Sequence, residues 1–503
     1  MAARPTTVGE LRASGYRPRS VKEEVRANLR AKLAAGERLF PAVLGYERTV
    51  IPGVVNALLS GHDFILLGLR GQAKTRILRA LVTLLDEEVP VLAGTELNDD
   101  PLAPISTQAE RVLERHGDAA PVEWLPREAR YNEKLATPDV SIADLLGDID
   151  PIKAATRKLT FADPEVIHFG IIPRTNRGIF AINELPDLAP RIQVGLFNIL
   201  EERDLQIRGF PVRIPLDILM VFSANPEDYT NRGAIVTPLK DRISSQILTH
   251  YPPDVTVAAE ITRQEAWTER GPEVVIPESA RLLVEEIAFA ARESELVDQA
   301  SGVSARVSIS AMELLASNLE RRALATGDKP VFPRLCDLHM VLPAITTKVE
   351  MVYEGEQQGA EVVARRLVGE AVQRVFDRTF PEVGKELGSG GEDDTGPYVP
   401  IVEWFAEGGR VTVDDEQSFD DYEAELMQVP GLPEIVERHG ETREERAYFA
   451  EMVLEGLHQH LKLARQDLDS QVSYKEMVKF QLLKPQGGRG GHGPAGGGLS
   501  GVH

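Results

Sequence analysis

The chain has very little cysteine and no long apolar run, and both absences limit what it can be. A single cysteine, Cys336, occurs in 503 residues, which excludes an internal disulfide and a cysteine-based zinc cage. One thiol suits a reducing compartment, so we expect a cytoplasmic protein. The longest apolar runs, such as DFILLG, fall well short of the roughly 20 residues that a helix needs to cross a bilayer. We therefore expect no membrane partner.

Positive charge is scarce as well. The chain carries 56 Lys and Arg against 78 Asp and Glu, a formal net charge of −22. A surface this acidic repels phosphodiester backbones unless a local basic patch overrides it, so nucleic acid is a disfavoured partner. Neither HExxH nor GxSxG occurs in the sequence, so the motif of a zinc protease and that of an α/β-hydrolase are both missing.

Short apolar strands alternate with helices between about residues 41 and 253. The strands that we expect are 63–68, 89–94, 178–183, 217–225 and 245–251, and the intervening helices include 74–88 and 190–203. Continuous apolar strands separated by helices indicate a parallel sheet covered on both faces, hence an α/β fold. Within this unit, LQIRGFPVRIPL (205–216) alternates around Gly209, which predicts an inserted β-hairpin.

The rest of the chain divides by composition. In an N-terminal helical extension, a capping box formed by Ser20 and Glu23 begins a helix. Glycine-rich, acidic or low-complexity stretches indicate a linker and a disordered tail. The expected segments are the extension 1–40, the core 41–253, a helical segment 254–348, a helical extension 349–383, a linker 384–398, an α+β region 399–484 that opens with a hairpin turning at Gly408-Gly409, and a Gly-rich tail 485–503.

A glycine-rich loop follows the first strand directly. GLRGQAKT (Gly68 to Thr75) offers what triphosphate binding requires: a tight loop of inward backbone N–H groups, the cation of Lys74 and the hydroxyl of Thr75 for magnesium. Ala73 replaces the glycine usually found before the lysine, and a methyl group is the smallest possible addition. The predicted nucleotide-binding residues are Gly68, Gly71, Gln72, Ala73, Lys74 and Thr75.

A second polar pair ends the strand GIFAIN. Parallel strands can present acidic side chains at their carboxyl ends, where one holds the water shell of magnesium and the next polarises the attacking water. Glu184 fills the second role, but Asn183 stands where the first acid is expected. Its amide oxygen can still accept a hydrogen bond from a metal-bound water, although it brings no charge. We therefore expect Thr75 and Asn183 at the metal, the latter through water, and slow hydrolysis.

In this order, GLRGQAKT, NRGIFAINE, FSANPEDY and TPLKDRI resemble the AAA+ ATPases. The resemblance is to the branch that holds the magnesium-chelatase ATPase subunit and the MoxR-type chaperone ATPases, and it covers about residues 40 to 345. The phosphate loop looks like the MoxR side, whereas LLGDIDP (145–151) and NRG (176–178) look like the chelatase side. The resemblance implies a five-stranded parallel P-loop core with a helical lid at 254–348, and ATP with Mg²⁺ as cofactors.

The resemblance also implies roles for single residues. Asn225 matches the polar residue that orients the attacking water, and Arg242 matches the arginine finger that serves the neighbouring subunit. Arg306, which opens a lid helix, is similar to the second sensor, and Arg177 is similar to a further trans-acting arginine. The hairpin 205–216 looks like the insert that faces the central channel of the ring.

An arginine finger serves the next protomer, so the resemblance implies a ring, most simply a hexamer of identical chains. The leading interpretation is an ATP-driven machine that remodels a client protein or a partner with a metal-binding adhesion-type domain. A nucleotide-gated scaffold with little turnover is the alternative, motivated by Asn183. A DNA motor shares the ring architecture but is disfavoured by the net charge.

Overall fold

The computed structural model describes residues 4–150, 152, 156, 166–207, 213–226, 234–271, 273–383, 396–468 and 471–477. Contacts divide the chain into two compact units, Met1–Arg378 and Thr379–His503. The tip of the expected hairpin, residues 384–395 of the expected linker and the expected tail 485–503 lie outside the described residues. Within the described ranges, every helix is too short or too polar to span a bilayer.

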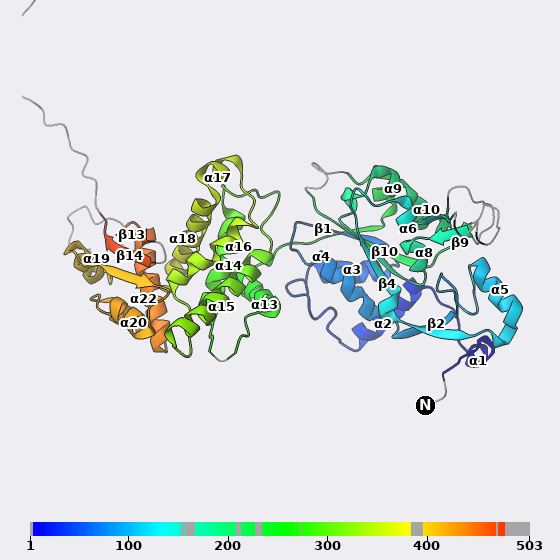
Figure 1. Ribbon diagram of the computed structural model, residues 1–503, viewed down its shortest axis with the longest axis horizontal. Coiled ribbons are helices and arrows are strands. Elements are labelled where there is room, and N and C mark those ends of the chain that lie inside the picture. The colour runs from blue at the N-terminus through cyan, green and yellow to red at the C-terminus, as the bar shows by residue number, and fades with distance from the viewer. Residues whose placement is uncertain are drawn as a thin grey trace, which may run out of the picture. The chain divides into compact units, whose positions relative to one another are not determined.

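A five-stranded parallel sheet forms the centre of the first unit (Figure 1). Its order is β11-β1-β10-β7-β4, and each neighbouring pair runs parallel. The strands are β1 (Phe64–Leu67), β4 (Tyr131–Leu135), β7 (Gly178–Asn183), β10 (Ile218–Ala224) and β11 (Ser245–Leu248). The predicted α/β fold class, with a parallel five-stranded sheet between helices, is confirmed.

The fifth strand is not the one that the sequence predicts. The stretch expected as a strand at 89–94 contributes β2 (Glu88–Leu92), which pairs antiparallel with β3 (Val122–Pro126) in a separate two-stranded sheet. The edge of the main sheet is β4, whose sequence YNEKL is almost entirely polar. An edge strand has one strand neighbour and partly exposed side chains, so it needs no apolar run. This is why the pattern missed it.

Alternate residues of the central strands enter two different cores. Phe64, Leu66 and Ala181 face a cluster formed with α2 (Val21–Ala34), α3 (Val50–Leu59) and α4 (Lys74–Ala80). Ile65 and Phe180 face the opposite cluster, which contains α9 (Pro190–Gly195) and α10 (Phe197–Glu201). The period of two therefore places helices on both faces of the sheet.

Several helices have bounds that differ from the sequence prediction. The helix expected at 74–88 is α4 followed by a 3₁₀ turn over Leu81–Leu84, because the chain must turn into β2 at Glu88. The helix expected at 190–203 is interrupted between α9 and α10. The capping box of Ser20 and Glu23 is present at the start of α2, as predicted.

Shorter elements decorate this core. The stems of the predicted hairpin are β8 (Asp204–Gln206) and β9 (Arg213–Pro215), which pair antiparallel with Leu205 opposite Ile214, so the hairpin is confirmed in its described part. The other elements are α1 (Val8–Ala13), α5 (Thr107–His116), α6 (Ile142–Leu145), β5 (Gly147–Ile149), β6 (Ile167–Phe169), α8 (Ile171–Arg174) and α12 (Thr237–Arg242).

Helices then follow one another to the end of the first unit (Figure 1). They are α13 (Val255–Glu265), α14 (Glu278–Glu293), α15 (Arg306–Thr326), α16 (Leu342–Thr346), α17 (Tyr353–Gln358) and α18 (Ala360–Thr379). The longest of them, α15, packs against α14, α13 and α16. The segment 254–348, which the resemblance predicts to be a lid, is helical and contains α13 to α16; the name lid is used below for this segment.

In its described residues, the second unit combines a small antiparallel sheet with four helices. The sheet order is β12-β14-β13, and the elements are α19 (Val399–Ala406), β12 (Val411–Asp414), α20 (Phe419–Met427), α21 (Leu432–Val436), α22 (Arg443–Gln459), β13 (Leu463–Leu468) and β14 (Gln471–Glu476). The hairpin expected around Gly408-Gly409 is wrong. Ile401 and Phe405, four residues apart, are both fully buried on one face of α19. Gly408, at φ +96°, ends the helix before β12 begins.

Candidate nucleotide-binding site

Three strands of the main sheet end at the same edge, and each is followed by a predicted functional residue. The phosphate loop follows β1, Glu184 follows β7, and Asn225 follows β10. Because these strands are parallel, their carboxyl ends converge. A cavity of about 340 Å³ lies there, lined by loop residues 70–76, by Glu184, Ser223 and Asn225, and by Ala305, Arg306 and Ile309 from the lid.

The loop from Gly68 to Thr75 is built on left-handed backbone and close contacts. Gly71 has φ +74° and Ala73 has φ +53°, so Ala73 takes a conformation that favours glycine. A Cβ at Gly68 would collide with the side chains of Thr249 and Gln72, which hydrogen-bond to each other at 2.6 Å. The loop therefore tolerates the alanine before the lysine but requires glycine at its start.

Three consecutive residues of this loop, Gly71, Gln72 and Ala73, line the cavity. Among the described residues, no acceptor takes the N–H groups of Gly71, Gln72 and Ala73. The Gln72 carbonyl, by contrast, accepts from the Tyr46 hydroxyl at 3.0 Å, which holds the loop from behind. Adjacent N–H groups left without an acceptor form a concave binding site for an anion. This arrangement fits a phosphate chain.

The Lys74 ammonium group lies at the floor of the same site. Its Nζ donates to the carbonyl of Gly68, to that of Leu69 at 2.8 Å, and to the Asn225 side-chain oxygen at 2.7 Å. Lys74 is 9% exposed, so its charge acts in a medium of low polarity. The structure thus brings together the predicted cation and the predicted water-orienting residue.

Thr75 and Asn183 also meet, as the sequence predicts. The Thr75 hydroxyl donates to the Asn183 side-chain oxygen at 3.4 Å, and the Ser223 hydroxyl donates to the same oxygen at 3.1 Å. Glu184, at the next position, has left-handed backbone (φ +57°), and its N–H donates to Ser223 at 3.3 Å. Glu184 lines the cavity, whereas Asn183 is not among its lining residues.

The cavity is lined by two acids, Glu184 and Glu265, of which Glu265 forms an ion pair with Arg76. In the parts of the chain that the structure describes, no group of three or more His, Cys, Asp or Glu side chains could hold a metal by itself. Mg²⁺ often binds through few protein ligands and the oxygens of substrate phosphates. Thr75 and Asn183 fit a magnesium ion that arrives with a nucleotide.

The predicted arginines are distributed unevenly. Arg306, at the first turn of α15, lines the cavity from the lid. Arg242 lies outside it: its Nε donates to Glu201 at 2.7 Å, and its guanidinium stacks 4.7 Å from the Phe197 ring centroid. With 27% of its side chain exposed, Arg242 is reachable from outside its own chain.

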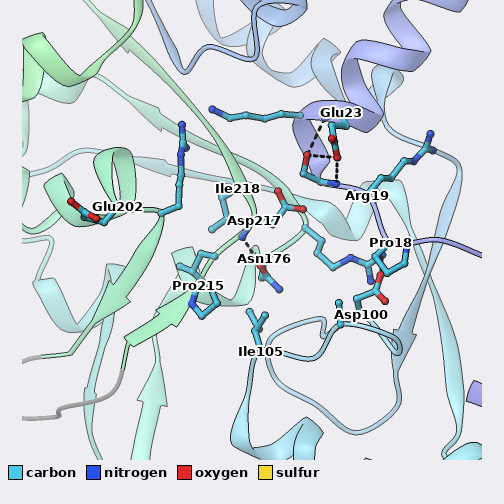
Figure 2. Close-up of a pocket in the computed structure, with 16 residues that line it drawn as sticks. Pro18, Arg19, Glu23, Asp100, Ile105, Asn176, Glu202, Pro215, Asp217 and Ile218 are labelled. Carbon is cyan, nitrogen blue, oxygen red and sulfur yellow. Dashed lines mark hydrogen bonds and ion pairs between the residues drawn. The ribbon is translucent and has the colours of Figure 1, made fainter.

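Arg177 lies at the opposite end of β7 from Glu184. It is 7% exposed and forms an ion pair with Asp100 at 3.0 Å and hydrogen bonds to the Pro90 carbonyl and the Tyr16 hydroxyl. It lines a second cavity, of about 510 Å³, at the amino ends of the strands. Figure 2 shows this cavity. The structure therefore does not bring Arg177 to the nucleotide cavity of its own chain.

A buried acid marks that second cavity. Asp217 precedes β10, and its N–H donates to Asn176 at 2.9 Å (Figure 2). Its carboxylate accepts from the N–H of Val21 at 2.8 Å. Burial raises the pKa of Asp217 to about 6, although the Val21 hydrogen bond and the charge of Arg177 oppose the shift. The carboxylate links the start of α2 to the sheet.

Some residues of the site have no signal in the sequence. Tyr46 and Thr249 brace the loop, and Ser304 of the lid lies directly against Gly71. They belong to segments far from GLRGQAKT, and their residue types are common on any surface.

No protein-family model and no curated protein matches the chain. Solved structures are similar in part. A model of the complex between subunits BchI and BchD of magnesium chelatase is 20% identical, covering 64% of this chain and 98% of that one, with a TM-score of 0.34. A predicted ATPase from Cytophaga hutchinsonii is 15% identical over 71% and 97%, with a TM-score of 0.29. NtrX from Brucella abortus is 15% identical, with a TM-score of 0.31. The similarity covers 54% of this chain and about half (48%) of the NtrX chain.

Proposed function

We propose that this chain is an AAA+-type ATPase that binds ATP at the loop Gly68–Thr75 and hydrolyses it as part of a ring. The observation that supports the proposal most is the convergence of Lys74, Glu184 and Asn225 at one cavity, beside backbone donors without acceptors. The loop N–H groups bind phosphate oxygens, and Lys74 adds a positive charge to the terminal phosphates.

The chain's own residues divide the chemistry between them. Glu184 lines the cavity and is the acid that polarises the attacking water. Asn225 orients that water, and its side-chain oxygen accepts a hydrogen bond from Lys74. Thr75 and Asn183 are the oxygens that would hold Mg²⁺, which neutralises phosphate charge when it is bound. Arg306 brings a second positive charge from the lid.

The apolar part of the cavity lining suits a base. Val43, Leu44, Ile261 and Ile309 line it with apolar side chains from both the core and the lid. A ligand that is apolar at one end and anionic at the other matches the cavity better than inorganic phosphate does. We therefore propose a nucleoside triphosphate, and ATP in particular.

Completion of the site by a neighbour is part of the proposal. Arg242 is outside the cavity of its own chain and partly exposed, as a residue that acts on another copy must be. An arginine at the γ-phosphate stabilises the charge that develops during transfer. A ring of identical chains, in which each Arg242 serves the next cavity, is the arrangement that we propose. Arg177 is not included, because its guanidinium is buried against Asp100.

We propose that ATP hydrolysis drives the remodelling of a partner protein. Lid and core share the cavity, so a change in the bound nucleotide changes what holds them together. The chelatase-like and MoxR-like versions of this proposal differ in the partner: a metal-binding adhesion-domain protein in the first, and a maturing client in the second.

A nucleotide-gated scaffold is the competing proposal, favoured by the neutral Asn183. Steady-state ATP turnover separates the two. We expect wild-type turnover that rises with protein concentration as rings form, and a loss of about 100-fold or more in Glu184→Gln, which should still bind ATP. Glu202→Gln, outside the nucleotide cavity, is the matched control. ATP binding with no turnover that depends on Glu184 would favour the scaffold.

A further inference from the structure

The guanidinium of Arg242 is held by three groups of its own chain. Its Nε donates to Oε2 of Glu201 at 2.7 Å, and Nη2 lies 2.6 Å from the same oxygen. Nη1 donates to the Pro238 carbonyl at 2.9 Å. The central carbon of the guanidinium lies 4.7 Å from the centroid of the Phe197 ring, a distance at which a cation is attracted to an aromatic face. One partly exposed cation is therefore fixed from several directions.

One face of α10 supplies two of these groups. Phe197 and Glu201 are the first and last residues of α10, and residues four apart lie on the same face of a helix. The helix itself is anchored, because Leu200 is buried in the same core cluster as Leu239 of α12. Since α10 also packs against α12, the helix that ends in the arginine and the helix that holds its guanidinium are both fixed to the core.

The ion pair leaves the end of the guanidinium available. A carboxylate can bind a guanidinium along its side, through Nε and one terminal nitrogen, or at its end, through both terminal nitrogens. Glu201 takes the side. Each terminal nitrogen carries two N–H groups and has one contact among those described above, so donors remain for an anion that comes from outside the chain. The pair therefore orients the arginine without covering its end.

Stability is a weak explanation for this arrangement. The Glu201 side chain is 55% exposed, and an exposed ion pair contributes little to the free energy of unfolding because water screens it. Orientation is a better one. A long side chain such as that of Arg242 loses much freedom when it is ordered, and a cation that is ordered beforehand stabilises developing charge without that cost.

We infer that Glu201 is a positioning residue for the nucleotide cavity of the neighbouring chain: it binds the side of the Arg242 guanidinium on the Phe197 ring and keeps the end of that guanidinium directed at the γ-phosphate held by the next copy. This inference rests on the proposed function. Glu201 does not line the cavity of its own chain. Its substitution should therefore lower turnover without weakening ATP binding by the chain that carries it.

The test measures ATP turnover in mixed rings that report on one arginine at a time. The first chain, Arg242→Ala, keeps its cavity and lacks the arginine. The second chain, Glu184→Gln, keeps the arginine but has a cavity that should not hydrolyse ATP. Each should be nearly inactive alone. We expect the mixture to regain turnover, because the second chain supplies Arg242 to the first.

Glu201→Gln is then added to the second chain. We expect it to lower the kcat of the mixture by about 5- to 30-fold and to leave KM for ATP unchanged; the upper value corresponds to the side-chain freedom of one arginine. Glu202→Gln in the same chain, at the next residue and outside the cavity, is the matched control and should have no effect. Glu201→Gln moved to the Arg242→Ala chain should also have none, because no arginine is there to be held, whereas a purely structural role would lower turnover from either chain. Equal or higher turnover with Glu201→Gln in the second chain would overturn the inference.

Ring assembly and the proposed function are controlled separately. Sedimentation with ATP gives the ring size of each mixture. If Glu201→Gln keeps the second chain out of rings, Phe197→Leu in that chain decides, because leucine keeps the apolar packing and removes the ring face: a lower kcat supports the inference, and an unchanged kcat overturns it. A mixture of Glu184→Gln with Arg242→Ala that regains no turnover refutes the proposed action of Arg242 on its neighbour instead, so the two failures are distinguishable.

Discussion

Gly71→Ala tests whether the lid sits directly on the phosphate loop. Gly71 has φ +74°, and a Cβ built there would lie 2.8 Å from the Cβ and 2.9 Å from the Cα of Ser304, and closer still to its hydroxyl. The hydroxyl can rotate away, but the Cα belongs to the backbone just before α15. The lid must therefore move away from the loop to admit one methyl group.

Gly71→Ala should reduce two quantities, the free energy of unfolding and the affinity for ATP. Left-handed backbone in a residue other than glycine costs about 1–2 kcal/mol, which lowers the free energy of unfolding. Displacing the lid also moves Arg306 away from the cavity, and losing a hydrogen bond to a charged group costs about 1.5–3 kcal/mol. That corresponds to ATP binding weakened by about 10- to 150-fold.

Gly94→Ala is the matched control, because Gly94 has φ +75° and its Cβ would meet nothing within 4 Å. Both variants should lose similar stability in urea unfolding, and only Gly71→Ala should lose ATP affinity in calorimetry. Ser304→Gly added to Gly71→Ala should recover part of the affinity, because it removes two of the three close atoms. Equal ATP affinity in Gly71→Ala and Gly94→Ala would refute the direct contact between the lid and the phosphate loop.

Two further predictions concern stability, both read from urea unfolding. The pKa of Asp217 is raised from 3.8 to about 6, so its contribution to stability is fully present below about pH 4 and is lost as the pH rises through 6. Asp217→Asn should therefore raise the free energy of unfolding by up to about 3 kcal/mol at pH 8, by about half as much at pH 5 and by little at pH 3. An equal effect at pH 8 and at pH 3 would contradict this. Arg130 is 1% exposed and donates to both oxygens of Glu24 at 2.7 and 2.6 Å. Glu24→Ala should therefore lower the free energy of unfolding by about 3–5 kcal/mol, whereas Glu361→Ala, at an exposed ion pair, should lower it by under about 1 kcal/mol. Similar losses in the two variants would contradict the buried pairing.

Apolar patterning located the elements that are buried on both sides. The strands β1, β7 and β10 have no exposed residue to break their apolar runs, so their positions and the loop after β1 could be predicted. The strand β2 has the same apolar character but pairs elsewhere. Burial is readable from residue types, whereas the choice of partner strand depends on contacts far along the chain.

The environment of the candidate site was less predictable than its residues. Lys74, Glu184 and Asn225 could be found because each follows a strand. The side chains that brace the loop could not be found in this way, because Tyr46 and Thr249 lie in other segments whose residue types carry no signal.

The central claim is that Lys74 and the loop N–H groups bind the phosphates of ATP. The direct measurement is a calorimetric titration of ATP with Mg²⁺ into wild type, into Lys74→Ala and into Lys32→Ala, a control whose ammonium pairs with Glu37 on the surface. We predict binding at one site per chain in wild type and in Lys32→Ala, and an affinity lower by about 10- to 150-fold in Lys74→Ala. Equal affinities in all three proteins, or no binding to wild type, would contradict the claim.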